Sequence, residues 1–319
     1  MKKALLRSIG IGIFAYLLIY VIDISELAKV LRSFNLWALV YVLPFHFSLW
    51  TLRVLRWKIL LKNEDIDLPF FDILAIAASG FFLGCMTPGR LGEFAKVKFL
   101  MNAGHPFCGA FMSSLLERFF DLAALFFYVV FAVVVCWNVL PDALIIYLLI
   151  AALCITGLLT AYIQRKRIKS IILQLIPETV SGNVEEKLSI LSYSINATRG
   201  SQRLVLLGYS IAMWGLNHII IYLLFHGAGF TLPIYYTFAF STLGSLASLI
   251  PISIYGVGIR ESIMIAMLPL VGYTPADAKT AGFMFGFMFV ILLIYHTLWG
   301  FIWWMSPIMQ RYFAKDSTS

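Results

Sequence analysis

The stretch FCGAFMSSLLERFFDLAALFFYVVFAVVVCW (residues 107–137) is apolar almost throughout and carries three charged side chains, those of Glu117, Arg118 and Asp121. A helix rises about 1.5 Å per residue and the hydrocarbon core of a bilayer is about 30 Å thick, so about 20 apolar residues cross it. The stretch exceeds that length. We therefore expect residues 107–137 to form a transmembrane helix.

Similar apolar runs occur along the whole chain of 319 residues, of which 61% are hydrophobic and 13% charged. Soluble domains average about 25% charged residues. The composition therefore predicts an all-α polytopic membrane protein. The predicted spans are residues 4–22, 36–52, 107–137, 143–163, 204–226 and 280–305.

The net charge of +8 comes from Lys and Arg residues that gather in short segments between the apolar runs. This distribution is typical of cytoplasmic loops and argues against a nucleic-acid partner. The basic residues at the start of the chain and after residue 305 place both termini in the cytoplasm. The first apolar run is expected to stay in place as a helix, because no small-residue cleavage site follows it.

Two further apolar segments, residues 70–100 and 234–271, are each interrupted by glycine, proline and charged residues. The charge distribution puts the two ends of each segment on the same face of the membrane. If residues 70–86 crossed alone, the basic region 165–203 would face outward, against that distribution. Each segment is therefore predicted to enter the membrane and return, as a re-entrant helical hairpin.

The sequence thus predicts six full transmembrane helices and two oppositely oriented re-entrant hairpins in one domain, residues 1–319. The hairpins stand in equivalent places in an inverted repeat, with a first repeat over about 36–137 and a second over about 204–305. A cytoplasmic connector is expected between the two, over about 164–203.

Each hairpin contains a polar loop with two glycines, a proline, an arginine and a glutamate, at residues 87–93 and 251–261. Irregular backbone and charges are costly inside hydrocarbon unless they line a cavity. Arginine pairs bidentately with phosphate oxygens, and helix N-termini attract anions. The candidate substrate-binding residues are Arg90, Glu93, Arg260 and Glu261, and the candidate loop residues are Pro88, Gly89, Gly92, Pro251, Gly256 and Gly258.

A structural alternative exists for these charges, since the arginines and glutamates could neutralise one another and hold the hairpins together. Glu117, Arg118 and Asp121 lie on one helical face that must look inward, either as a structural clamp or as substrate-binding residues of the cavity. Arg53 and Arg56 are expected to reach the membrane interface. His46, Asn217, His218 and His296 are expected to form interhelical hydrogen bonds.

No metal-ligand spacing, P-loop, nucleophile elbow or dinucleotide fingerprint occurs in the sequence. We therefore expect no metal, no cofactor and no catalytic residues, and a transporter is favoured over an enzyme.

Several motifs resemble, in their order, the transmembrane (flippase) region of lysylphosphatidylglycerol synthases and related stand-alone membrane proteins. They are Arg56-Trp57, Pro88–Glu93, Glu117-Arg118-Phe119-Phe120-Asp121, and Pro251 with Gly256–Glu261. The resemblance implies a bacterial or archaeal plasma (inner) membrane protein that handles phospholipids or polyprenyl-linked glycolipids. The synthases carry a soluble aminoacyl-transferase domain after this region, whereas the sequence here stops at residue 319 shortly after the last predicted span, so we do not expect this chain to make the lipid that it handles. It also lacks the arginine that the family often carries on that span, where His296 stands.

The leading hypothesis is a lipid flippase that translocates an anionic phospholipid or polyprenyl-linked (glyco)lipid by alternating access. Its partners would be membrane lipids, and homo-oligomer formation stays open. A second hypothesis is a membrane-embedded transferase that uses Glu93 or Glu261 as general base on a lipid or polyprenyl-phosphate headgroup. A third is a non-catalytic membrane partner of a lipid-modifying synthase or glycosyltransferase.

Overall fold

The computed structural model describes residues 32, 34–85, 87–140, 200–249, 256 and 258–313, with the backbone alone at residues 88–90 and 200. The described part is helical and contains no strand. Its elements are α3 (Trp37–Tyr41), α4 (Leu43–Lys62), α5 (Phe70–Cys85), η2 (Pro88–Phe94), α6 (Ala95–Asn102), α7 (Phe107–Val135), α11 (Gly200–Gly227), α12 (Ile234–Ala247), α13 (Ile259–Met267), η3 (Leu268–Val271), α14 (Pro275–Trp304) and α15 (Pro307–Phe313).

Four stretches of helix in the described part are long and apolar enough to cross a membrane: Trp37–Lys62, Phe107–Val135, Ser201–Gly227 and Pro275–Trp304. They confirm four of the predicted spans. The first of them continues ten residues beyond the predicted end at residue 52, through the basic stretch. The predicted spans 4–22 and 143–163 and most of the connector lie outside the described residues, so the number of six spans stays a prediction.

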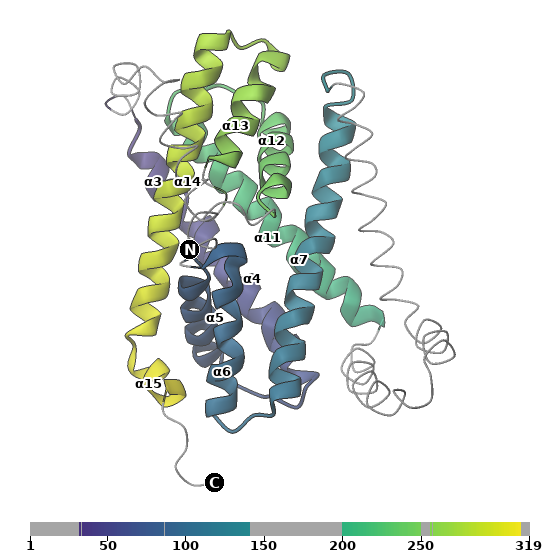
Figure 1. Ribbon diagram of the computed structural model, residues 1–319, viewed down its shortest axis with the longest axis vertical. Helices are drawn as coiled ribbons and strands as arrows, with labels where there is room; N and C mark the ends of the chain where they lie inside the picture. Colours follow the sequence, from purple (N-terminus) through teal and green to yellow (C-terminus); the bar gives the residue numbers. More distant parts are fainter. Residues whose placement is uncertain are drawn as a thin grey trace, which may run out of the picture.

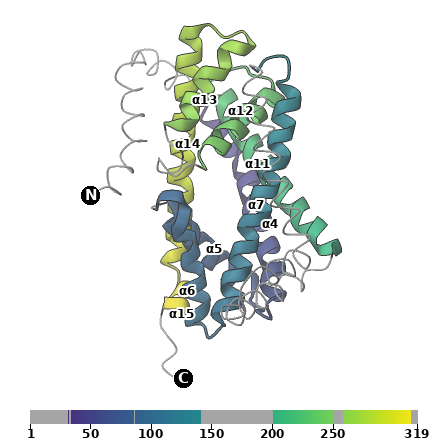
Figure 2. The ribbon, with the colours of Figure 1, turned by 45° about the vertical axis from the view of Figure 1, so that its right-hand side comes forward.

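Within the described residues, each predicted hairpin segment contains short helices that pack against one another. Helix α5 packs against η2 and α6, and α12 packs against α13. In Figures 1 and 2, α5 and α6 lie toward one end of the molecule and α12 and α13 toward the other, while α14 runs past both pairs. The packed helices accord with two hairpin segments, whose re-entrant course stays a prediction. Their depth in a membrane and the inverted repeat remain predictions.

The first polar loop folds tightly onto the end of α5. Gly92 donates its backbone N–H to Thr87 Oγ1 at 2.7 Å. A Cβ atom on Gly92 would lie 2.3 Å from the carbonyl oxygen of Leu83, a separation that real Cβ atoms essentially never show. The close approach of the two backbone segments therefore requires glycine here.

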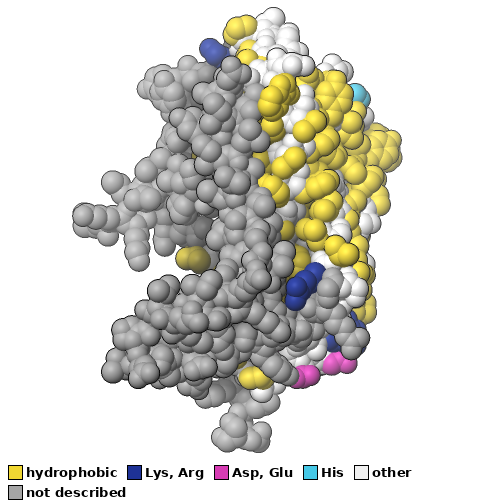
Figure 3. All heavy atoms as spheres, turned by 90° about the vertical axis from the view of Figure 1, so that its right-hand side faces the viewer, with side chains coloured by type: hydrophobic (Ala, Val, Ile, Leu, Met, Phe, Trp, Pro, Cys, Tyr) yellow, Lys and Arg dark blue, Asp and Glu magenta, His cyan; other side chains and the backbone are white. Residues whose placement is uncertain are grey.

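The outer surface of the described helices is mostly hydrophobic. In Figure 3 apolar side chains cover most of the described surface on the face shown, and the acidic side chains seen there lie at one end. Exposed side chains include Phe127, Val134, Leu298 and Ile302. A lipid-facing surface explains this pattern, because large exposed apolar areas are rare on soluble monomers.

Candidate functional site

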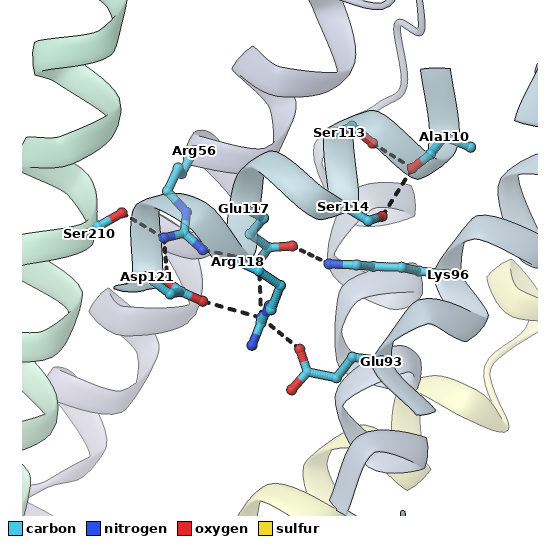
Figure 4. Close-up of polar contacts among 10 residues, drawn as sticks. All are labelled: Arg56, Glu93, Lys96, Ala110, Ser113, Ser114, Glu117, Arg118, Asp121 and Ser210. Carbon is cyan, nitrogen blue, oxygen red and sulfur yellow. Dashed lines mark hydrogen bonds and ion pairs between the residues drawn. The ribbon is translucent and has the colours of Figure 1, made fainter. Parts of the chain in front are cut away.

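Six charged side chains meet in the interior, where α4, η2, α6 and α7 come together (Figure 4). Three are basic and three acidic, so their formal charges cancel. We refer to these residues as the charged cluster: Arg56, Glu93, Lys96, Glu117, Arg118 and Asp121.

Arg56 is fully buried and holds three helices together. Its Nη2 lies 3.1 Å from Glu117 Oε1, and its Nη1 donates to Asp121 Oδ1 at 2.5 Å and to Ser210 Oγ at 2.6 Å. The expectation that Arg56 reaches the membrane interface is therefore wrong. The two carboxylates of α7 and the hydroxyl of α11 draw its guanidinium inward, and their hydrogen bonds replace those of water.

Lys96 of α6 belongs to the cluster although the sequence analysis gave it no role in the site. Its ammonium is bound to Glu117 and lies 4.6 Å from the ring centre of Trp57. The side chain is 5% exposed. A lysine with an acidic partner and an aromatic face satisfies its charge without water. Its spacing of three residues from Glu93 places both near the same helical face, but does not identify Glu117 as its partner.

Arg118 joins the first polar loop to α7. Its Nη2 lies 2.6 Å from Glu93 Oε2 and 3.2 Å from Asp121 Oδ2. Glu93 thus forms an ion pair, as the structural alternative expects. Its partner is Arg118 of α7 and not the arginine of its own loop. The side chain of Arg90 lies outside the described residues.

A cavity of about 100 Å³ lies beside the cluster and is lined by residues from both predicted repeats. It receives two arginines, Arg53 from α4 and Arg260 from α13, together with Asp121 from the cluster. The other lining residues are Leu49, Phe81, Met213, Trp214, Asn217, Ser245, Phe289 and His296.

The two cavity arginines rest on aromatic rings. The Arg53 guanidinium carbon lies 5.1 Å from the Trp50 ring centre and 5.2 Å from that of Phe81. That of Arg260 lies 4.3 Å from Phe289. Such stacking fixes the plane of a guanidinium and leaves its edge for hydrogen bonds.

Arg260 also spans the second helix pair. It donates to Ser245 Oγ at 2.9 Å and to Ser248 Oγ at 3.1 Å, both on the α12 side. Arg260 was predicted as a substrate-binding residue, and the structure places it in the cavity wall. Arg53 was assigned to the membrane interface, and the structure places it in the same wall instead.

Glu261 is buried at the start of α13 and caps that helix. Its Oε2 accepts the backbone N–H of Gly258 at 2.7 Å. Its Oε1 has no hydrogen-bond partner among the described residues. Gly258 has φ +87°, and Gly286 of α14 faces the carboxylate so closely that a Cβ there would lie 2.0 Å from Glu261 Cγ.

The backbone of the polar loops differs from its predicted role. Gly92 and Gly258 were predicted as loop residues of an anion site formed with helix N-termini, but the backbone N–H group of each donates to a side chain of its own loop. Gly256 is buried with φ +80° and packs on Ser248 and Arg260. Pro251 lies outside the described residues, and Pro88 and Gly89 are described as backbone of η2 alone.

The single polar residues of the apolar helices have separate surroundings. His218 meets Ser241 Oγ at 2.7 Å and Thr242 Oγ1 at 3.2 Å, which confirms an interhelical bond between α11 and α12. Asn217 and His296 line the cavity. The ring nitrogens of His46 have no hydrogen-bond partner in the described part, and the ring packs against Tyr295 and His296.

Within the described ranges no three His, Cys, Asp or Glu side chains are grouped so that they could hold a metal ion. The described interior thus holds the ion pairs of the charged cluster and, beside them, a cavity lined by arginines, a hydroxyl, an amide and an imidazole. Long apolar helices that enclose such an interior define a polytopic membrane protein with a buried polar site.

The chain belongs to the family described as the lysylphosphatidylglycerol synthase TM region, whose model matches residues 7–308. It is 24% identical over 305 residues to a UPF0104 membrane protein of Pyrococcus horikoshii, which covers 87% of this chain and 90% of the relative. It is 25% identical over 250 residues to a UPF0104 membrane protein of Methanothermobacter thermautotrophicus, 70% of each chain. No solved structure matches the chain.

Proposed function

We propose that this protein moves a lipid with an anionic headgroup, a phospholipid or a polyprenyl-linked (glyco)lipid, from one leaflet of the plasma membrane to the other. The observation that carries the proposal is the cavity in which Arg53 of the first predicted repeat and Arg260 of the second meet. Both termini would lie in the cytoplasm.

The chemistry of the cavity suits a phosphate. Guanidinium groups present paired N–H donors that match two phosphate oxygens, and stacking on Trp50 and Phe289 holds the donors in place. Ser245 and Asn217 add neutral polar groups to the wall. A cavity of about 100 Å³ has room for a phosphate group, and the acyl or prenyl chains would stay in the surrounding lipid.

The arrangement of the helix pairs supports alternating access. Glu93 and Arg118 join the first pair to α7, and Arg260, which lines the cavity, joins α13 to α12 within the second pair. Movement of one repeat relative to the other would open the cavity to one leaflet and then to the other, as in transporters built from inverted repeats.

Reconstituted vesicles test the proposal. Fluorescent short-chain phosphatidylglycerol is incorporated, and its appearance in the outer leaflet is followed by chemical quenching. We expect Arg53→Gln and Arg260→Gln to slow translocation at least 10-fold. The matched control is Arg311→Gln, because Arg311 pairs with Asp72 at 2.7 Å on α5 and does not line the cavity. Equal rates in the parent and both cavity variants would refute the proposal.

A further inference from the structure

Two buried histidines lie in contact beside the cavity, one from each predicted repeat. The ring centres of His46 on α4 and His296 on α14 are 4.8 Å apart, and the two residues are 1% and 7% exposed. His296 lines the cavity, and the ring of His46 also packs on Tyr295 with 4.5 Å between the ring centres. The pair thus places a group that can bind a proton in the wall of the cavity.

The hydrogen bonds of the two rings indicate which nitrogen can take up the proton. His296 Nδ1 lies 2.7 Å from the carbonyl oxygen of Leu292. A carbonyl oxygen only accepts, so Nδ1 carries the hydrogen and Nε2 is the basic nitrogen of the neutral ring. Both ring nitrogens of His46 are buried and have no hydrogen-bond partner among the described residues. Packing alone does not explain such an imidazole, because an apolar ring would fill the same place without that cost.

The charged groups that face the pair come from three other places in the fold. Arg53 on α4, Asp121 on α7 and Arg260 on α13 line the same cavity as His296, and the lining residues of α5, α11 and α12 carry no charge. Asp121 is held by two arginines of the charged cluster. Glu261 faces α14 ten residues before His296, about 15 Å along the helix, and caps α13. The two cavity arginines repel an added positive charge on His296, and an anion bound to them attracts it.

On the basis of the proposed function, we infer that the protein takes up one proton on the pair of His46 and His296 with each anionic lipid and carries both across the membrane in the same direction. The proton comes from the water on the side where the lipid enters, binds at Nε2 of His296 and returns to the water on the other side. His46 is the second base beside it. A lipid with one negative charge then crosses with no net charge, so a pH gradient drives its movement.

The coupling follows from reciprocity. A phosphate at the cavity arginines stabilises an imidazolium at His296, and the imidazolium must strengthen phosphate binding by the same factor. Because α4 and α14 belong to different predicted repeats, movement of one repeat relative to the other changes the contact between the two rings. The movement that opens the cavity to the second leaflet therefore also changes the surroundings of the proton.

Binding of two short-chain probes to the purified protein in phosphatidylcholine nanodiscs tests the coupling: phosphatidylglycerol and a prenyl phosphoryl mannose. Both are phosphodiesters that stay ionised between about pH 5.5 and pH 7.5, so the lipid itself takes up no proton. We expect at least one probe to bind about 5-fold or more tightly at the lower pH. Calorimetry in buffers of different ionisation enthalpy should show proton uptake on binding. Binding without proton uptake and with equal affinity at both pH values would overturn the inference and leave the proposed function standing. Failure of both probes to bind would overturn both.

The vesicle assay of the proposed function, repeated with a pH gradient, tests the direction. Fluorescent phosphatidylglycerol should reach the outer leaflet about 5-fold faster when the vesicle interior is acidic than when it is alkaline. Equal rates in the two gradients would overturn the inference, whereas the transport itself would support the proposed function.

Variants assign the proton to its residues. His296→Gln is expected to abolish proton uptake and to make the remaining affinity independent of pH. His46→Phe keeps an aromatic ring in the same packing and is expected to weaken the pH dependence at least about 2-fold; it carries the assignment should His296→Gln fail to fold. The matched control is His218→Gln, because His218 is a buried histidine that bonds to hydroxyls of α12 and does not line the cavity. It should keep the full pH dependence. Full proton uptake in the folded variants of the pair, or its loss in His218→Gln as well, would overturn the assignment.

Discussion

The two polar loops are alike in sequence and differ in what surrounds their glutamates. Glu93 of the first loop meets Arg118 from the helix that follows, at 2.6 Å. Glu261 of the second loop meets Gly286 from the helix that follows, and its carboxylate caps α13 instead. Glu93 of the first loop is thus neutralised within the charged cluster. Arg260 of the second loop lies in the cavity wall instead.

This difference indicates a division of labour between the two helix pairs. In the first pair, ion pairs fix the loop to α7. In the second pair, hydrogen bonds to serines and a ring contact hold Arg260 in the cavity wall. Substitutions in the first pair should therefore act mainly on stability, and substitutions of Arg260 mainly on transport.

The largest effect is expected from Arg56→Met. Removal of this guanidinium leaves Glu117 and Asp121 with one fewer buried partner, and breaking a buried ion pair costs about 3–5 kcal/mol. The free energy of unfolding, measured by denaturant titration in detergent micelles, should fall by that amount. As a control, Arg311→Met removes a pair whose arginine is 64% exposed, so the loss should be about 1 kcal/mol or less. A fall in unfolding free energy for Arg56→Met no larger than that for Arg311→Met would contradict a stabilising role of the charged cluster.

Gly286→Ala tests the packing around the second glutamate. The new Cβ would lie 2.0 Å from Glu261 Cγ, so the fully buried side chain of Glu261, which caps α13, would have to shift. Overpacking of this kind costs about 1–3 kcal/mol. The midpoint of thermal unfolding should fall accordingly. Gly208→Ala, which meets no atom within 4 Å, should leave it unchanged or raise it.

The comparison of the glutamates themselves is made by Glu93→Gln and Glu261→Gln. The first substitution removes an ion pair with Arg118 and should cost about 1–3 kcal/mol of unfolding free energy. The second keeps an oxygen that can accept from Gly258 N–H, so it should cost less than about 1 kcal/mol. If Glu261→Gln proved the more damaging of the two, the proposed division of labour would be reversed.

The long helices could be predicted from the sequence because the length and hydropathy of an apolar run are local properties. A run of about 20 apolar residues is long enough to cross a bilayer. The inward face of α7 followed from spacing alone. The surroundings of Arg53 and Arg56 near the end of α4 could not be predicted, because arginines at the end of an apolar run usually lie at the membrane interface. The partners of Arg56 stand 61, 65 and 154 residues away, and only tertiary packing brings them together. For the same reason Lys96, Asn217 and His296 could not be assigned to a cluster or a cavity in advance.

Ser210→Ala should have the smallest effect, and it separates the hydrogen bonds of the cluster from its charges. The substitution removes a neutral acceptor 2.6 Å from Arg56 and leaves both carboxylates of α7 in place. A buried hydrogen bond contributes about 0.5–1.5 kcal/mol, or somewhat more when one partner is charged. We expect the unfolding free energy to fall by about 1 kcal/mol, measured by the same denaturant titration, with transport retained. A loss as large as that of Arg56→Met would instead mean that the link from α4 to α11, rather than the neutralisation of charge on α7, is what Arg56 provides.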